Sequence, residues 1–216
     1  MEILTFPSGL IQTNVYLCIE GDSCVIVDAP QGTWATVEGV LRSRGLTLRA
    51  ILITHGHWDH TGGIVEIQRQ LAGTRVPVYA HRDTCDWVEH PEKMSPFFRM
   101  AFPQLTEADF PPCKIDKILE DGESFELLGK TWRALYVPGH CPGSLAFYCE
   151  AAGTVFTGDA LFCGSIGRSD FPGGDYKLLS KSIREKLMTL PAGTRVFPGH
   201  GPDSTIAAEA ENNPYF

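Results

Sequence analysis

Residues 54–63, THGHWDHTGG, decide how this sequence folds. The four residues before them, AILI at 50–53, form a short apolar run typical of a buried strand. Side chains alternate along a strand, so His55 and His57 project to one side, and the turn that leads into the next helix brings Asp59 and His60 to the same volume. One segment can therefore supply ligands to two adjacent metal ions.

Three further loops each follow an apolar run and present one potential ligand. Residues 137–144, VPGHCPGS, recur in outline at 197–204, FPGHGPDS, so that His140 and His200 both lie just beyond a predicted strand. Asp159 follows the apolar run at 154–157 in the same way. Proline and glycine stop a strand and turn the chain, which places these side chains on loops at a sheet edge.

The donor types indicate which metals would bind. Five of the seven histidines end strands in glycine-rich turns, a concentration that packing alone does not explain. Imidazole and carboxylate ligands suit zinc, iron or manganese, and the lack of a thiolate ligand argues against a purely structural zinc site.

Strands and helices alternate through most of the chain, which indicates an α/β protein built from two halves with one plan. Helix 34–44, with Thr33 as its N-cap, has one apolar face. The predicted strands are 14–20, 24–28, 48–54, 76–80, 114–119, 124–128, 131–137, 145–149, 154–157 and 194–197, and the other predicted helices are 62–71 and 176–190.

Composition narrows the class of protein. The chain has 216 residues, which predicts one domain over 1–216, and its net charge of −8 excludes a nucleic-acid or anionic-membrane partner. A start without signal-peptide features and the lack of an apolar run of roughly 18 residues predict a cytoplasmic protein. Seven scattered cysteines without a Cys-x-x-Cys pair predict no disulfide framework, and Cys141 is expected to be a buried apolar residue rather than a nucleophile.

Residues 87–113 break the periodicity with prolines, phenylalanines and methionines. Such a segment could roof a substrate pocket, contact another subunit of a homo-oligomer, or simply cover the core. His81 and His90 are expected in solvent-exposed polar roles.

The pattern His55-x-His57-x-Asp59-His60, followed by His140, Asp159 and His200, resembles the metallo-β-lactamase superfamily through nearly the whole chain. Within that superfamily, GDALF at 158–162, GSIGR at 164–168 and FPGHG at 197–201 look like the glyoxalase II branch, hydroxyacylglutathione hydrolase. The resemblance implies a four-layer αβ/βα sandwich, in which two mixed β-sheets pack face to face with helices outside.

The resemblance also implies two divalent metal ions, zinc first and iron or manganese as alternatives. The implied ligands are His55, His57 and His140 on the first metal, Asp59, His60 and His200 on the second, and Asp159 on both. A bridging hydroxide would be the nucleophile, so Asp59 and Asp159 would be catalytic through the metals. Asp28 could support a ligand imidazole, and Arg168 could bind an anionic substrate.

The implied reaction is hydrolysis of a small-molecule thioester such as S-D-lactoylglutathione. The longer glyoxalase II enzymes carry a C-terminal helical domain that contacts glutathione, whereas only sixteen residues follow His200 here, so glutathione specificity is not implied. The alternatives are a mononuclear-iron persulfide dioxygenase, which holds its metal by two histidines and an aspartate, an ester, lactone or β-lactam hydrolase, and a non-catalytic metal-binding module.

Overall fold

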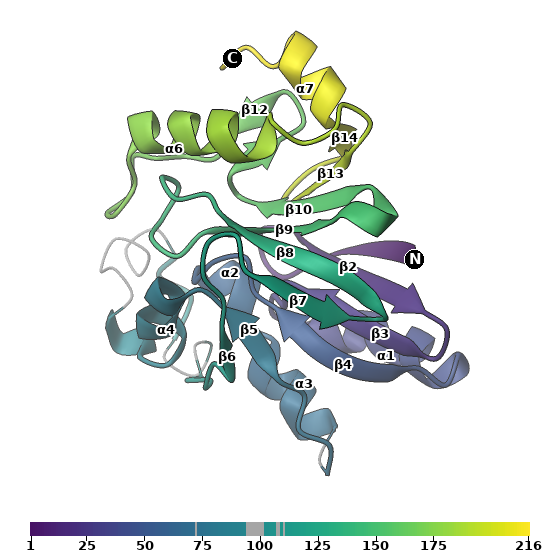
Figure 1. Ribbon diagram of the computed structural model, residues 1–216. Coiled ribbons are helices and arrows are strands. Elements are labelled where there is room, and N and C mark those ends of the chain that lie inside the picture. Colours follow the sequence, from purple (N-terminus) through teal and green to yellow (C-terminus); the bar gives the residue numbers. More distant parts are fainter. Residues whose placement is uncertain (72, 94–101, 107–108, 110) are drawn as a thin grey trace.

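Two six-stranded β-sheets pack face to face, and each carries helices on its outer side (Figure 1). The structure is a computed structural model that describes all of residues 1–216 except 72, 94–101, 107–108 and 110. The first sheet contains β1 (Glu2–Ser8), β2 (Thr13–Glu20), β3 (Ser23–Val27), β4 (Thr47–Leu52), β5 (Val78–Ala80) and β6 (Lys117–Ile118). The second contains β7 (Ser124–Leu127), β8 (Lys130–Tyr136), β9 (Leu145–Cys149), β10 (Thr154–Gly158), β13 (Arg195–Pro198) and β14 (Ser204–Thr205).

Both sheets are mixed. In the first, β1, β2 and β3 pair antiparallel and β3, β4, β5 and β6 pair parallel. In the second, only β10 and β13 pair parallel, in the order β14-β13-β10-β9-β8-β7. The helices are α1 (Thr33–Ser43), α2 (Trp58–Thr61), α3 (Ile64–Gln70), α4 (Arg82–Val88), α6 (Tyr176–Ser182) and α7 (Ile206–Asn212). The predicted four-layer sandwich is confirmed.

Three apolar layers separate the four layers of secondary structure. β2 is almost wholly buried because alternate side chains enter two of them. Val15, Leu17 and Ile19 pack outward under α1 and α3, whereas Tyr16 and Cys18 pack inward between the two sheets. On the far side, α6, the π-helix Ile183–Leu187 that continues it, and α7 cover the second sheet with Leu179, Ile183, Leu187 and Ile206. Figure 1 shows these helices on the outer faces of the sandwich.

Several element boundaries differ from the sequence-based prediction. β1, α4 and α7 were not predicted. The predicted helix 62–71 is present as α3, and the short helix α2, which precedes it, was not predicted. Helix 176–190 begins as α6 and continues as a π-helix over Ile183–Leu187. The predicted cap Thr33 is wrong: Gly32 caps α1, while the Thr33 hydroxyl donates to the Pro30 carbonyl at 2.6 Å.

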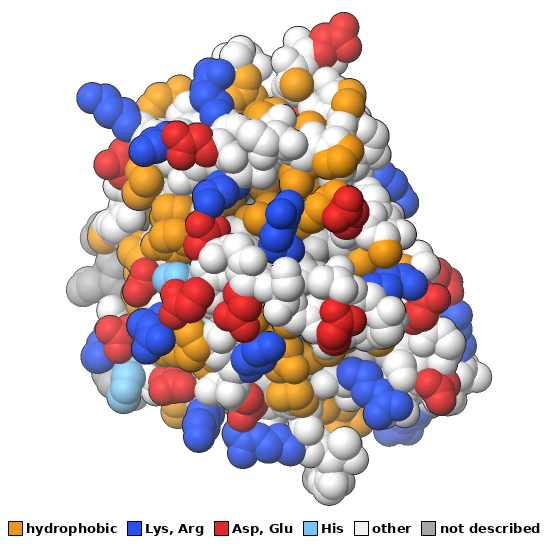
Figure 2. Space-filling model, in the orientation of Figure 1, with side chains coloured by type: hydrophobic (Ala, Val, Ile, Leu, Met, Phe, Trp, Pro, Cys, Tyr) orange, Lys and Arg blue, Asp and Glu red, His pale blue; other side chains and the backbone are white. Residues whose placement is uncertain are grey.

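Two further observations concern helix length and surface charge. No helix among the described residues is long and apolar enough to cross a membrane. On the face drawn in Figure 2, Lys and Arg side chains are interspersed with Asp and Glu, without a stripe of one sign.

Candidate metal centre

The candidate ligands meet at one edge of the sandwich because of strand direction. β8, β10 and β13 run the same way, since β8 and β10 are each antiparallel to β9 and β10 is parallel to β13. The loops that leave these three strands carry His140, Asp159 and His200. The loop after β4 in the first sheet and the short helix α2 bring the 55–60 segment to the same place. All seven residues that the sequence singled out are therefore brought together.

Three imidazoles form the first set of donor atoms. The Nδ1 atom of His57 lies 3.0 Å from Nε2 of His55 and 3.0 Å from Nε2 of His140. All three side chains are buried. Ligands of a tetrahedral zinc ion with bonds near 2.05 Å lie about 3.3 Å apart, so the three nitrogens fit around one ion of this size.

The second set joins two imidazoles to a carboxylate. Asp59 Oδ2 lies 3.2 Å from His60 Nε2 and 3.3 Å from His200 Nε2. Asp159 faces both sets: its Oδ1 is 3.3 Å from His60 Nε2, and its Oδ2 is 3.6 Å from His200 Nε2 and 3.7 Å from His140 Nε2. A carboxylate in this position can bridge two cations.

Two buried polar atoms at the centre support metal binding. Among the described residues, His60 Nε2 and Asp159 Oδ1 make no hydrogen bond although both are shielded from solvent. A buried polar atom without a hydrogen bond costs about 1–3 kcal/mol, so native proteins rarely keep one without a function. Cations held between these donors would satisfy both atoms, and the residues present fit such ions.

Hydrogen bonds around the centre fix which nitrogen of three imidazoles, those of His55, His60 and His140, faces it. Asp28 Oδ2 accepts hydrogen bonds from His60 Nδ1 and from the Thr54 hydroxyl, both at 2.8 Å. Because its proton goes to Asp28, the Thr54 oxygen accepts from His55 Nδ1 at 3.1 Å. Nδ1 of His140 donates to the Arg168 carbonyl at 2.7 Å. The Nε2 lone pairs of these histidines are thereby directed at the metal centre.

Two imidazoles of the first set, His55 and His57, are held in the neutral form. Burial, followed by the neighbouring imidazole of His140, lowers the pKa of His57 to about 3. Burial, followed by the neighbouring imidazoles of His60 and His57, also holds the pKa of His55 well below its ordinary value. Both rings are therefore neutral at pH 7, the form that binds metal.

In the second set, nearby groups of opposite charge favour the charged forms of the histidines and of the shared carboxylate. Burial opposes ionisation of His60, but the carboxylates of Asp59 and Asp159 outweigh it and raise the pKa well above its ordinary value. The pKa of His200 is raised as well, because the same two carboxylates outweigh its burial. Burial likewise opposes charge on Asp159, yet His60, followed by His140, holds its pKa at about 2.

The loop that carries His200 is held by β2, which sequence reasoning missed. The Asn14 side chain donates to the carbonyls of Pro198 at 3.0 Å and Gly201 at 2.9 Å, and the Asn14 backbone N–H donates to the Gly199 carbonyl at 2.7 Å. The Tyr16 hydroxyl also donates to the Pro198 carbonyl at 2.5 Å. These contacts span more than 180 positions of sequence, and no local pattern marks them.

Thr13 and Gly199 also shape the second set. The Thr13 hydroxyl donates to Asp59 Oδ2 at 3.0 Å. Any side chain at Gly199 would overlap Asp159 Oδ1 and the His60 ring. Glycine at this position therefore lets the Asp159 and His200 loops come together.

A 310 Å³ cavity opens onto the metal centre and is lined by five of the candidate ligands together with largely apolar side chains. Arg168 lies on its wall, as the sequence predicted, but the guanidinium is paired with Asp170. From the 87–113 segment, Phe102 lines the cavity and Trp87 lies 5.3 Å from the His57 ring. The remainder of that prediction concerns residues that include 94–101, 107–108 and 110, which lie outside the described part.

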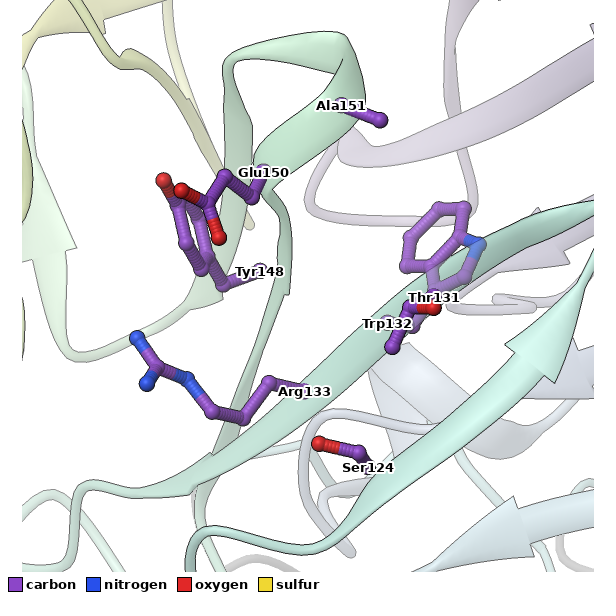
Figure 3. Close-up of a pocket in the computed structure, with 7 residues that line it drawn as sticks. All are labelled: Ser124, Thr131, Trp132, Arg133, Tyr148, Glu150 and Ala151. Atoms are coloured by element: carbon purple, nitrogen blue, oxygen red, sulfur yellow. The ribbon is translucent and has the colours of Figure 1, made fainter.

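A second hollow, of 380 Å³, lies on the strands of the second sheet and contains no histidine. In Figure 3, Arg133, Tyr148 and Glu150 lie on one side of these strands while the Trp132 ring points to the other. The Arg133 guanidinium lies 5.4 Å from the centre of the Tyr148 ring. Its side chains offer no set of metal donors, so the smaller cavity is the candidate site.

Burial decides two further predictions made from the sequence, those for Cys141 and His81. Burial raises the pKa of the Cys141 thiol to about 12, so it is a packed thiol rather than a nucleophile, as expected. The expectation of an exposed His81 is wrong. That ring is buried, accepts a hydrogen bond from the Asp83 N–H at 3.1 Å as the cap of α4, and stacks on Tyr136 at 4.3 Å.

Fold and site together define a metallo-β-lactamase-type protein. The chain belongs to the metallo-β-lactamase superfamily, whose family model matches residues 8–200. Among curated proteins it is 35% identical to the probable metallo-hydrolase YqgX of Bacillus subtilis, over 100% of this chain and 97% of the relative. It is 32% identical to the hydroxyacylglutathione hydrolase GloC of Haemophilus influenzae, over 100% and 98%.

Solved structures give the same family. The chain aligns with the BLEG-1 B3 metallo-β-lactamase at a TM-score of 0.87 and 35% identity, covering 99% of each chain. It aligns with TTHA1623 in a di-iron-bound form at a TM-score of 0.83 and 35% identity, covering 100% of each chain. The glyoxalase II-like resemblance stated from the sequence is thus confirmed at the level of the family.

Proposed function

We propose that this chain is a dinuclear metal-dependent hydrolase that cleaves thioesters such as S-D-lactoylglutathione. One observation carries the proposal: the Asp159 carboxylate lies between the two sets of donor atoms, with Oδ1 beside His60 of the second set and Oδ2 beside both His200 of the second set and His140 of the first. A carboxylate shared in this way is typical of sites that hold two cations about 3.5–4 Å apart.

The chemistry follows from what the residues hold in place. Bound divalent cations polarise a carbonyl and lower the pKa of water from 15.7 toward neutrality. The chain supplies ligands of fixed orientation: Asp28 holds His60 at 2.8 Å, and the Arg168 carbonyl holds His140 at 2.7 Å. Because these contacts exist before substrate arrives, the centre is organised in advance for the charge that develops in acyl transfer.

The lack of a proton donor among the site carboxylates favours a thioester. The neighbouring histidines outweigh burial and lower the pKa of Asp59 and of Asp159, so neither carboxylate has a proton to give at pH 7. The imidazoles are committed as ligands. An amine or alkoxide must take up a proton as it leaves, whereas a thiolate with a pKa of about 8.5 departs without one.

Two relatives support this proposal, one through its name and one through its metals, and both zinc and iron remain candidate metals. GloC bears the name hydroxyacylglutathione hydrolase, and TTHA1623 was solved with two irons. Histidine and carboxylate donors accept both zinc and iron, with manganese as a third choice. We favour zinc or iron.

Metal analysis paired with an activity assay tests the proposal. Protein produced with zinc or with iron should contain about two metal ions per chain and cleave S-D-lactoylglutathione, and His55→Ala should lose metal and activity together. About one iron, with oxygen uptake on glutathione persulfide and no thioester cleavage, would instead identify a mononuclear dioxygenase. Unchanged metal content in His55→Ala would overturn the ligand assignment. It would favour the alternative that the protein is a non-catalytic metal-binding module.

A further inference from the structure

Apart from the candidate ligands, the described residues that line the 310 Å³ cavity are almost all apolar. Its apolar members come from the β1–β2 loop, α2, β11 (Leu161–Phe162) and the loops that carry Phe102 and Phe171. They are Ile11, Trp58, Phe102, Phe162 and Phe171. Trp58 is buried beneath them, with the Phe102 ring 5.2 Å away in an edge-on arrangement. Any group bound beside the metal centre therefore rests on aromatic and aliphatic carbon.

Arg168 is the one cation among the described residues of this wall, and its charge is already matched. Its Nε donates to Asp170 Oδ1 at 3.0 Å and its Nη2 donates to Asp170 Oδ2 at 2.9 Å. The flat face of the guanidinium lies 4.2 Å from the centre of the Phe171 ring. A substrate carboxylate could still reach the Nη1 side of the guanidinium, but the Asp170 carboxylate already offsets the positive charge that would attract it.

Glutathione is poorly matched to such a wall. It carries two carboxylates several bonds from the thioester sulfur, and these would lie beyond the metal ligands, over the apolar side chains. Removing a carboxylate from water without a paired cation is unfavourable. Cations at the centre act on the scissile carbonyl, not on these remote groups. An uncharged apolar group, in contrast, gains from each side chain that it covers.

Building on the thioester hydrolysis proposed above, we propose that this chain selects uncharged, apolar acyl thioesters over the anionic thioester of glutathione. The reaction balances without an oxidant or reductant. The oxygen of water bonds to the acyl carbon, the carbon–sulfur bond breaks, and the electron pair leaves with sulfur. The products are a carboxylic acid and a thiol. A cavity of 310 Å³ suits a small acyl group, being at the lower end of the ~300–1,000 Å³ range of ligand sites.

Ile11 is the residue of the wall that tests this selection most cleanly. It lies in the loop between β1 and β2, is 39% exposed, and lines the cavity. Its neighbour Leu10 is 52% exposed in the same loop but does not line the cavity. The two positions therefore share a local environment and differ in contact with the proposed substrate group, so that Leu10→Ala is a matched control for Ile11→Ala.

The experiment compares kcat/KM for two substrates on the metal-loaded enzyme, phenylacetyl-N-acetylcysteamine and S-D-lactoylglutathione. We expect the wild type to prefer the phenylacetyl thioester by at least about tenfold, a typical value for apolar pocket contacts. Ile11→Ala should reduce this preference several-fold, and Leu10→Ala should leave it unchanged. Ile11→Lys, which adds a cation at the rim, should raise kcat/KM for lactoylglutathione, a gain that misfolding cannot imitate.

The outcomes separate this inference from the proposed function. If the wild type cleaves lactoylglutathione in preference, or if Ile11→Ala and Leu10→Ala shift the preference equally, thioester hydrolysis stands and the apolar selection is wrong. If the metal-loaded wild type cleaves neither thioester, the proposed function itself fails, and this inference fails with it.

Discussion

The carboxylate of Asp28 accepts a hydrogen bond from Nδ1 of His60 at 2.8 Å across 32 positions of sequence. Asp28 comes directly after β3 and has a φ of 56°. This is a left-handed conformation that aspartate adopts more readily than most residues. Its other oxygen accepts from the Thr54 N–H at 2.8 Å. One buried carboxylate thus fixes the ring of His60 and, through Thr54, the start of the ligand segment.

Replacing this carboxylate should weaken the second set of ligands. Asp28→Asn removes the charge that raises the basicity of His60, and loss of such a supporting group typically costs 10–100-fold in metal affinity. A metal titration against a competing chelator measures it. Asp22→Asn, at an exposed turn position, is the control. Equal affinities in the two variants would show that Asp28 does not support a ligand.

Asn14 should be required for the geometry of the His200 loop. It is 3% exposed and donates to two carbonyls of that loop. Asn14→Ala leaves the Gly201 carbonyl without its Asn14 donor and the Pro198 carbonyl with only the Tyr16 hydroxyl, a loss of about 1–3 kcal/mol in the free energy of unfolding. We expect a lower melting temperature together with weaker binding of one metal only. The exposed helical Asn212→Ala should change neither quantity. A destabilised variant with both metals retained at full affinity would limit Asn14 to a folding role.

Gly199→Ala should separate the loops of Asp159 and His200. A methyl group there overlaps Asp159 Oδ1 and the His60 ring, so the loops must move apart. We predict loss of one metal equivalent and at least a hundredfold loss of activity, about 2.7 kcal/mol in transition-state stabilisation. Gly193→Ala, where an added methyl meets nothing within 4 Å, is the matched control. Normal metal content in Gly199→Ala would contradict the close approach of these loops.

Acid should release one metal before the other. The pKa values of His60 and His200 are raised, so protons compete with metal at these rings as the pH falls below neutrality. His57, with a pKa of about 3, stays neutral over the same range. Each competing proton weakens binding by about tenfold per pH unit. Dialysis from about pH 7 to pH 5 should leave one metal per chain, on the three-histidine set. Simultaneous loss of both metals would contradict this asymmetry.

Local patterns predicted the alternation of strands and helices and the loops that present the candidate ligands, whereas the four layers were implied by the family resemblance. An apolar strand that ends in Pro-Gly or in Gly-Asp positions the next side chain at a sheet edge, and this holds for His140, Asp159 and His200 alike. Asp28 was inferred in the same way from its place at a strand end, and the structure places it against His60.

The contacts that the sequence did not predict either join residues far apart in the chain or depend on side-chain geometry that no sequence pattern indicates. Asn14 lies next to the apolar centre of β2, residues 15–19, and its partners at 198 and 201 lie at the end of β13 in the other sheet and in the loop that follows. Arg168 was predicted as an anion site, yet Asp170 two positions later pairs with it, which only side-chain geometry reveals. β1 was missed because it is an edge strand with a proline and mixed burial.

The central claim is that seven side chains hold two metals that share Asp159. Anomalous diffraction from crystals of the zinc-loaded protein tests it most directly. We predict two peaks about 3.5–4 Å apart, one within bonding distance of His55, His57 and His140 and the other of Asp59, His60 and His200, with an Asp159 oxygen on each. A single peak, or zinc bound away from these side chains, would contradict the account.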